Sequence, residues 1–173
     1  LPDALGEWRE AIDLCRFYAQ EAEKLQSSHE LPHITGEQNR LFWAARGVFV
    51  CISPWNFPLA IFLGQIAAAI VTGNTVIAKP ASQTSLIASK IGQLLAKTHL
   101  PDGVVNLIFA RSSELGDYLF KHPDLAGVVF TGSTETAQHI QLSLAQRRGA
   151  IIPFIAETGG LNAMIADSSA LAE

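Results

Sequence analysis

Short apolar runs alternate with amphipathic stretches along the chain from residue 47 onward. The apolar runs predict strands at residues 48–52, 75–78, 104–109, 127–130 and 151–155. Stretches with helical periodicity follow the first four runs, at residues 58–71, 82–98, 113–121 and 133–146. The runs are continuous rather than alternating, which is typical of strands covered on both faces. This order predicts an α/β fold with a doubly wound open parallel sheet.

A helix and a hairpin are predicted before this region. Apolar residues spaced by three and four predict a helix over residues 3–26, and we expect this stripe to pack on the sheet. The stripe consists of Leu5, Trp8, Ile12, Cys15, Ala19 and Ala22. Residues 40–44 and 47–53 are candidates to pair as a hairpin through Ala45 and Arg46.

Composition excludes several classes of protein. The 173 residues are 49% hydrophobic and 16% charged, which excludes a disordered chain and suits one domain. Twelve basic and sixteen acidic residues give a net charge of −4, so a nucleic-acid partner is not indicated. The longest apolar stretch, residues 57–71, is too short to span a bilayer, so no transmembrane segment is expected.

Cysteine and histidine spacing predicts no metal site. Cys15 and Cys51 form no metal-spaced pair, and Pro32 interrupts any helix that would align His29 with His33. Unpaired cysteines without a secretory segment predict a reducing, cytoplasmic location, with peripheral membrane attachment through other parts of a longer protein left open. Because the sequence starts at Leu1, we expect it to be part of a longer chain.

Polar residues and glycines follow every predicted strand, and parallel strands end at one edge, where ligands bind. Gly132 permits a tight turn before a helix whose N-terminus could bind a phosphate, with Ser133 adding a hydroxyl or only capping the helix. Lys79 could reach ligand hydroxyls or phosphates, or be a solvated surface lysine. Ser82 is expected to cap the next helix and could also touch the ligand.

Two further residues have the chemistry of catalytic groups. Asn56, held between Trp55 and Phe57, could donate a hydrogen bond to a developing oxyanion or could cap a helix. Glu157, if partly buried between apolar strands, could act as a general base, or it could be a loop carboxylate that bonds neighbouring N–H groups. The dinucleotide fingerprint G-x-G-x-x-G is absent, so a dinucleotide site cannot rest on that motif.

Four motifs occur together: ISPWNFP at residues 52–58, GNTVIAKP at 73–80, FTGSTE at 130–135 and ETGG at 157–160. In this order and approximate spacing, the chain resembles the aldehyde dehydrogenase superfamily over nearly its whole length. Residues 47–53, 59–65 and 157–165 resemble the L-glutamate γ-semialdehyde (pyrroline-5-carboxylate) dehydrogenase module of the bifunctional proline utilization A proteins.

The resemblance implies a Rossmann-like fold and the oxidation of L-glutamate γ-semialdehyde to L-glutamate with NAD in proline catabolism. It implies that Asn56 forms the oxyanion hole, that Glu157 activates water, that Lys79 holds the adenosine ribose and that Ser133 binds the pyrophosphate. Residues implied along the cofactor are Ile52, Ser53, Pro54, Trp55, Gly132, Gly159 and Gly160. Implied partners are the aldehyde substrate, the remainder of the parent chain and further copies in a homo-oligomer, with residues 34–52 as a hairpin in an interdomain or subunit contact.

Other features limit what the resemblance implies. The nucleophilic cysteine is expected beyond Glu173, so residues 1–173 are predicted to be a truncated NAD(P)-binding domain that is inactive alone. Many NAD-specific members carry Glu where this chain has Ser82, so NADP remains open. FAD would belong only to a separate proline dehydrogenase domain of a bifunctional parent. Alternatives are a coenzyme A-acylating or other semialdehyde dehydrogenase, the former disfavoured by Glu157, and a non-catalytic nucleotide-binding module.

Overall fold

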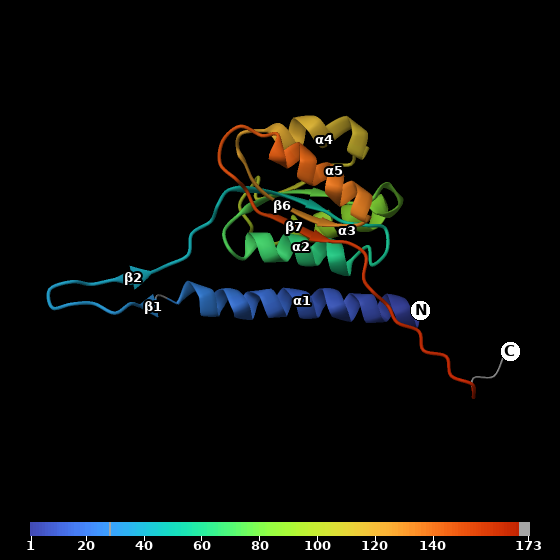
Figure 1. The fold of residues 1–173 in the computed structure, drawn as a ribbon, viewed down its shortest axis with the longest axis horizontal. Coiled ribbons are helices and arrows are strands. Elements are labelled where there is room, and N and C mark those ends of the chain that lie inside the picture. The colour runs from blue at the N-terminus through green and yellow to red at the C-terminus, as the bar shows by residue number, and fades with distance from the viewer. Residues whose placement is uncertain (28, 170–173) are drawn as a thin grey trace.

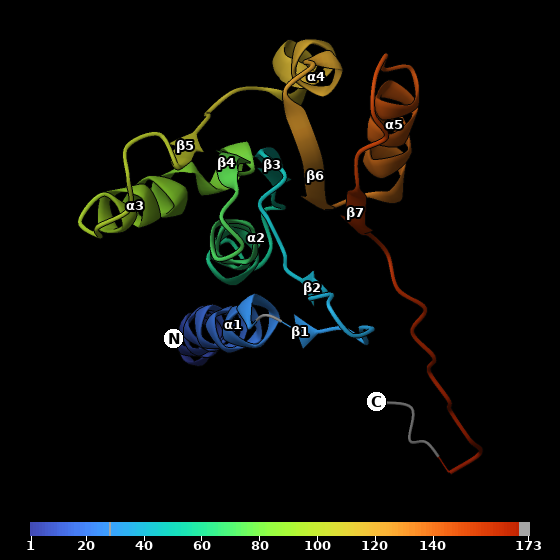
Figure 2. The same ribbon diagram turned by 90° about the vertical axis from the view of Figure 1, so that its left-hand side faces the viewer.

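The computed structural model describes residues 1–27 and 29–169, and its centre is a five-stranded parallel sheet (Figures 1 and 2). The strands are β3 (Val48–Ile52), β4 (Thr75–Lys79), β5 (Val105–Leu107), β6 (Leu125–Thr131) and β7 (Phe154–Glu157). Their order is β5-β4-β3-β6-β7, and every neighbouring pair is parallel. The predicted doubly wound α/β fold is therefore confirmed.

Helices cover both faces of the sheet (Figure 2). They are α2 (Ala60–Ile70), α3 (Ser85–Leu95), α4 (Ser112–Lys121) and α5 (Thr134–Ala145). Alternate residues of β3 face opposite ways: Phe49 and Cys51 join a core with α2 and α3, whereas Val50 joins a core with α5. Both faces of the strand are thus buried, which accounts for its unbroken apolar sequence.

The last strand begins later than its apolar run predicts. The apolar run predicts a strand over residues 151–155, but β7 begins at Phe154 and pairs with β6 from Val128 onward. Pro153 has no N–H to donate, although its carbonyl accepts from the Val128 N–H at 3.0 Å. The strand is consequently displaced toward Glu157, which becomes its final residue.

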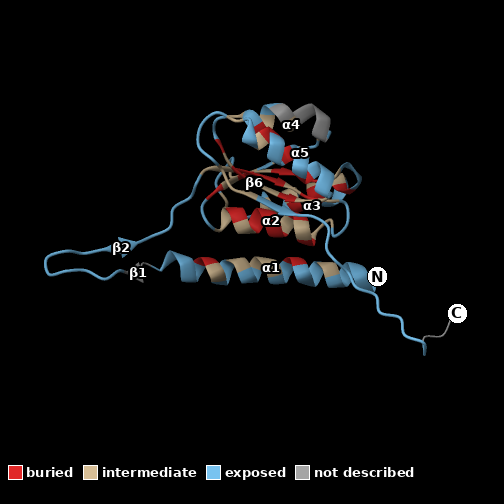
Figure 3. Ribbon diagram, in the orientation of Figure 1, coloured by how far each residue is buried: buried red, intermediate tan, exposed pale blue. Residues whose placement is uncertain are grey.

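The first helix, α1 (Pro2–Gln26), packs on α2 and not on the sheet, so it adds a layer outside the helices that cover this face (Figures 1 and 3). The predicted packing of its large apolar stripe is wrong, because Leu5, Trp8 and Ile12 are 50%, 60% and 41% exposed. The contact instead uses small residues. The buried residues of α1 are Ala11 and Ala22, and Leu14 lies where a Cβ on Gly64 would be only 2.8 Å from its Cδ1.

The predicted hairpin between residues 40–44 and 47–53 is also wrong. Strand β2 (Arg40–Leu41) pairs antiparallel with β1 (His29–Glu30), and Gly36 in the connection has a φ of +94°. Strand β3 has no free edge because β4 and β6 occupy both of its sides. The hairpin that lies partly within residues 34–52 is therefore β1–β2, which projects away from the sheet (Figure 1).

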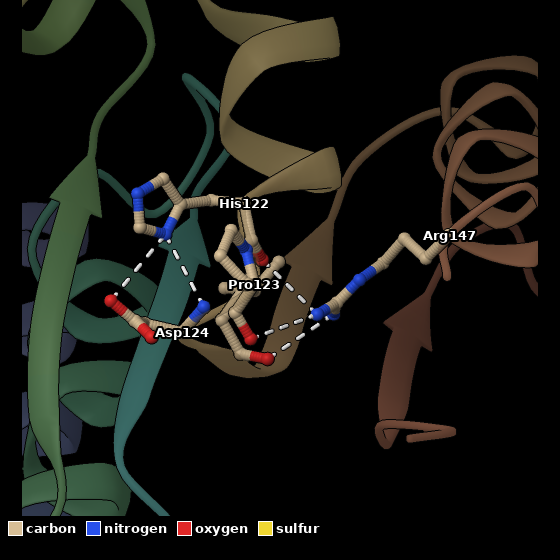
Figure 4. Close-up of polar contacts among 5 residues, drawn as sticks. His122, Pro123, Asp124 and Arg147 are labelled. Atoms are coloured by element: carbon tan, nitrogen blue, oxygen red, sulfur yellow. Dashed lines mark hydrogen bonds and ion pairs between the residues drawn. The ribbon is translucent and has the colours of Figure 1, made fainter. Parts of the chain in front are cut away.

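At the amino edge of the sheet, one arginine ties α5 to the turn before β6 (Figure 4). The Arg147 guanidinium donates to the carbonyls of Leu125, His122 and Pro123 at 3.2, 3.1 and 3.3 Å. Three carbonyls of one turn thus share a single cation. Within the described residues, no helix is both long and apolar enough to cross a membrane.

Candidate functional site

An open groove of about 600 Å³ crosses the carboxyl ends of β3, β4 and β6. The chain passes from β3 to β4 and β5 on one side and then returns to β6 on the other, so the groove lies at the switch point of the sheet. It brings together nine of the twelve residues predicted from the sequence. These are Ile52, Ser53, Pro54, Trp55, Asn56, Lys79, Ser82, Gly132 and Ser133.

Lys79, at the end of β4, is only 7% exposed. The alternative of a solvated surface lysine is therefore wrong. Burial lowers the pKa of its ammonium group, because the charged form loses hydration. Its Nζ donates to the Pro80 carbonyl over a long 3.5 Å, so most of its capacity as a three-proton donor is left for a ligand in the groove.

The N-terminus of α5 forms the opposite wall. Ser133 caps the helix, since its Oγ accepts from the Thr136 N–H at 3.2 Å and donates to Thr136 Oγ1 at 2.9 Å. The residues of the first turn that precede Thr136 keep their N–H groups for an anion. The positive end of the helix dipole lies at the same place. Gly132 keeps the turn narrow, because a Cβ there would lie 2.6 Å from Phe130 Cζ.

The loop that carries Asn56 is held differently from the sequence expectation. Trp55 and Phe57 are exposed, so aromatic packing does not hold the amide. Asn56 does not cap α2 either, because the N-cap position is Leu59. Among the described residues, no hydrogen bond involves the Asn56 side chain, which leaves its amide available to a ligand in the groove.

The ETGG motif lies beside the groove. Glu157 ends β7, and its carbonyl accepts from the Gly132 N–H at 3.0 Å, which places both residues at the same edge. Its side chain is exposed, so the partial burial considered for it is not present. Thr158 lines the groove, whereas the exposed Gly159 and Gly160 do not. The structure thus brings the motif to the site edge without enclosing its carboxylate.

Ser82 lines the groove but does not cap α3 as expected. It is the first residue of a 3₁₀ turn, η1 (Ser82–Thr84), and its carbonyl accepts from Ser85 Oγ at 2.9 Å. Because the 3₁₀ turn precedes α3, the cap position moves to Thr84. The Ser82 hydroxyl is therefore not used as a helix cap.

Sequence reasoning missed Gln65, which lies beneath the groove. This side chain of α2 is 8% exposed, and its Nε2 donates to the Ile52 carbonyl at 3.2 Å and to Thr131 Oγ1 at 3.0 Å. Gln65 thus joins the ends of β3 and β6. Within the described residues its Oε1 and the Ser53 Oγ are buried without a partner. The available signal was a single amide within an apolar run.

Neither cysteine belongs to the groove. Cys51 is fully buried in β3, and burial raises the pKa of its thiol to about 12. Cys15 lies on α1, and burial raises its pKa as well. Both thiols are therefore held in the neutral form at physiological pH. No group of three or more His, Cys, Asp or Glu residues in the described part of the chain is arranged to hold a metal ion.

Comparison with known proteins agrees with this architecture. The bifunctional protein PutA of Salmonella typhimurium is 48% identical over 174 residues, which cover 99% of this chain and 12% of that protein. The 1-pyrroline-5-carboxylate dehydrogenase 1 of Halalkalibacterium halodurans is 39% identical over 175 residues, which cover 97% of this chain and 33% of that enzyme. A crystal structure of proline utilization A from Bradyrhizobium japonicum matches with a TM-score of 0.92 and 54% identity, over 98% of this chain and 18% of that one.

The family assignment rests on nearly the entire sequence. This chain spans between 12% and a third of the length of the curated relatives described above. The model of the aldehyde dehydrogenase family matches residues 1–172 of this chain. The chain belongs to the aldehyde dehydrogenase family.

Proposed function

We propose that this chain is the dinucleotide-binding part of an aldehyde dehydrogenase that oxidises L-glutamate γ-semialdehyde to L-glutamate with NAD in proline catabolism. The observation that carries the proposal is the single groove in which a buried lysine, a helix N-terminus and Asn56 meet. The names of the relatives, 1-pyrroline-5-carboxylate dehydrogenase and proline utilization A, support the substrate.

The groove residues fit a dinucleotide. The groove has a volume of about 600 Å³, which lies within the range of small-molecule sites. The N-terminus of α5, with Ser133, offers N–H groups to a pyrophosphate, and the Lys79 ammonium offers donors to ribose hydroxyls. Gly132 allows the turn before α5 to lie against the Phe130 ring, where a Cβ would not fit.

The proposed reaction converts an aldehyde, NAD⁺ and water into a carboxylic acid, NADH and a proton. When bound, the nicotinamide supplies the acceptor for the hydride. The Asn56 amide donates a hydrogen bond to the oxygen that becomes negative when a thiolate adds to the carbonyl. Glu157 takes the proton of the water that hydrolyses the resulting thioester. We infer that the thiolate comes from outside these 173 residues, because Cys51 is buried and neutral and Cys15 lies on α1.

Ser82 brings no carboxylate that would repel a 2′-phosphate, so NAD is preferred less strictly than with Glu at this position. The remainder of the parent chain would complete the substrate pocket, in a cytoplasmic homo-oligomer. FAD would bind only in a separate proline dehydrogenase domain.

The test uses the full-length protein that carries this chain. We expect NADH formation that depends on glutamate γ-semialdehyde and does not require coenzyme A. Lys79→Met should raise the Kd for NAD at least tenfold in titration calorimetry, whereas Lys90→Met on the exposed side of α3 should not change it. NADH formation that requires coenzyme A would identify an acylating dehydrogenase instead, and NAD binding without any aldehyde oxidation would identify a non-catalytic module.

A further inference from the structure

A carboxylate of α1 caps the N-terminus of α2, far away in the sequence. The Leu59 N–H donates to Glu7 Oε1 at 2.7 Å, and the Ala60 N–H donates to the same oxygen at 3.3 Å. Helix α2 has no acidic residue in its first turn and no side-chain cap of its own. Glu7 therefore satisfies two otherwise unpaired donors and places a negative charge at the positive end of the helix.

The capped turn is directly connected to the loop of Asn56. Only Phe57 and Pro58 separate Asn56 from Leu59. Phe57 has a φ of +51°, the one positive φ of a non-glycine residue in the described chain, and the ring of Pro58 fixes its own φ. A linker with so little freedom transmits a shift of Leu59 to Asn56. The strained Phe57 conformation also needs neighbours that hold it in place.

Glu7 is itself held firmly. Its side chain is half-buried between the helices, and α1 packs along α2 through Ala11 and the contact of Leu14 with Gly64. Both ends of the loop are therefore fixed: Gln65 and the Lys79 carbonyl hold the end of β3, and Glu7 holds the start of α2.

We propose that Glu7 is a positioning residue that, through the first turn of α2, holds Asn56 in the groove. The inference rests on the proposed function only in naming the oxyanion as the target of the Asn56 amide. Nothing about Glu7 itself requires contact with substrate or cofactor. Its effect should therefore be confined to kcat and should disappear when the amide of Asn56 is absent.

The first experiment measures the loop without reference to activity. Hydrogen–deuterium exchange of the full-length protein should show that Glu7→Ala accelerates exchange of the Leu59 and Ala60 amides at least tenfold, with β4 and β6 unchanged. Glu7→Gln, which retains an acceptor but no charge, should give a smaller acceleration and remain folded. Glu10→Gln, on the exposed side of α1, is the matched control and should change nothing. Unchanged exchange in Glu7→Ala would overturn the proposal.

The second experiment measures the coupling of Glu7 to Asn56. Glu7→Ala should lower kcat about tenfold with the Kd for NAD unchanged within twofold, because only the oxyanion contact is displaced. In an Asn56→Ala background the same substitution should lower kcat less than twofold. An equal loss in both backgrounds would refute the positioning role. If the wild-type protein oxidises no aldehyde, the proposed function fails, and the exchange experiment still decides whether Glu7 holds the loop.

Discussion

Replacement of Gln65 tests whether the groove depends on a buried hydrogen-bond donor. Its Nε2 bonds the Ile52 carbonyl and the Thr131 hydroxyl, which belong to adjacent strands at the floor of the groove. Gln65→Leu removes both bonds, at about 1 kcal/mol each. It also removes the buried, unpartnered Oε1, whose burial costs a similar amount. The gain from removing Oε1 offsets part of the loss of the two bonds, so we expect the free energy of unfolding to change by no more than about 1 kcal/mol.

Gln65→Glu keeps the shape of the side chain but replaces its Nε2 donor with an oxygen acceptor. An ionised carboxylate would face the Ile52 carbonyl without a donor, so we expect a loss of about 3 kcal/mol or more at neutral pH. Burial would raise the pKa of the new carboxyl above its unfolded value of about 4.3. The folded variant then binds a proton more tightly than the unfolded chain. The loss should consequently be largest above the folded pKa and should shrink as the pH falls.

Urea denaturation at pH 7.5 and pH 5.5 measures both variants against the wild type. Gln141→Glu, on the exposed side of α5, is the control for adding a carboxylate and should leave stability unchanged within about 0.5 kcal/mol. Equal destabilisation by Gln65→Leu and Gln65→Glu at both pH values would show that loss of the shared donor, and not a buried charge, sets the cost, and the reasoning would be refuted.

Three further substitutions test other contacts. Arg147→Met should lower the free energy of unfolding by about 2 kcal/mol in urea, because three carbonyls lose a charged donor, whereas Arg148→Met should change it by less than about 0.5 kcal/mol. Burial in the folded state raises the pKa of the Cys51 thiol from 9.0 to about 12. The neutral thiol therefore contributes to stability below pH 9, and this contribution is lost as the pH rises toward 12. Cys51→Ala should flatten the decline in the free energy of unfolding measured above pH 9. Gly132→Ala should raise the Kd for NAD at least tenfold in calorimetry, because the added Cβ meets the buried Phe130 ring and forces the turn that carries the N-terminus of α5 to shift, and an unchanged Kd would show that the turn tolerates a Cβ.

The sheet and the edge that carries the groove were predictable from local pattern. Continuous apolar runs separated by helical periodicity specify doubly covered strands, and parallel strands must all end at one edge. Asn56, Lys79 and Ser133 each lie at or just after the carboxyl end of a different strand, so their meeting in one groove follows from the topology. The burial of Lys79 did not follow, because it depends on which loops close around the strand end.

The errors arise where tertiary contacts outweigh periodicity. The stripe of Leu5, Trp8 and Ile12 has the size and spacing of a core face, but α1 packs on another helix. Close approach of two helices favours small residues such as Ala11 and Gly64. Adjacency in sequence likewise suggested the wrong hairpin, since pairing requires a free strand edge and both edges of β3 are used.

The residues that support the site are less visible in sequence than those that would touch a ligand. Ligand-facing groups must stand next to a strand end, so a short motif contains them. A supporting side chain can bond a backbone group from any element that reaches it, and its position in the sequence is unconstrained. Glu7 bonds an N–H 52 residues away, and Gln65 bonds a hydroxyl 66 residues away. Because such bonds are defined by the packing of α1 on α2 and of α2 beneath the groove, only the folded structure identifies them.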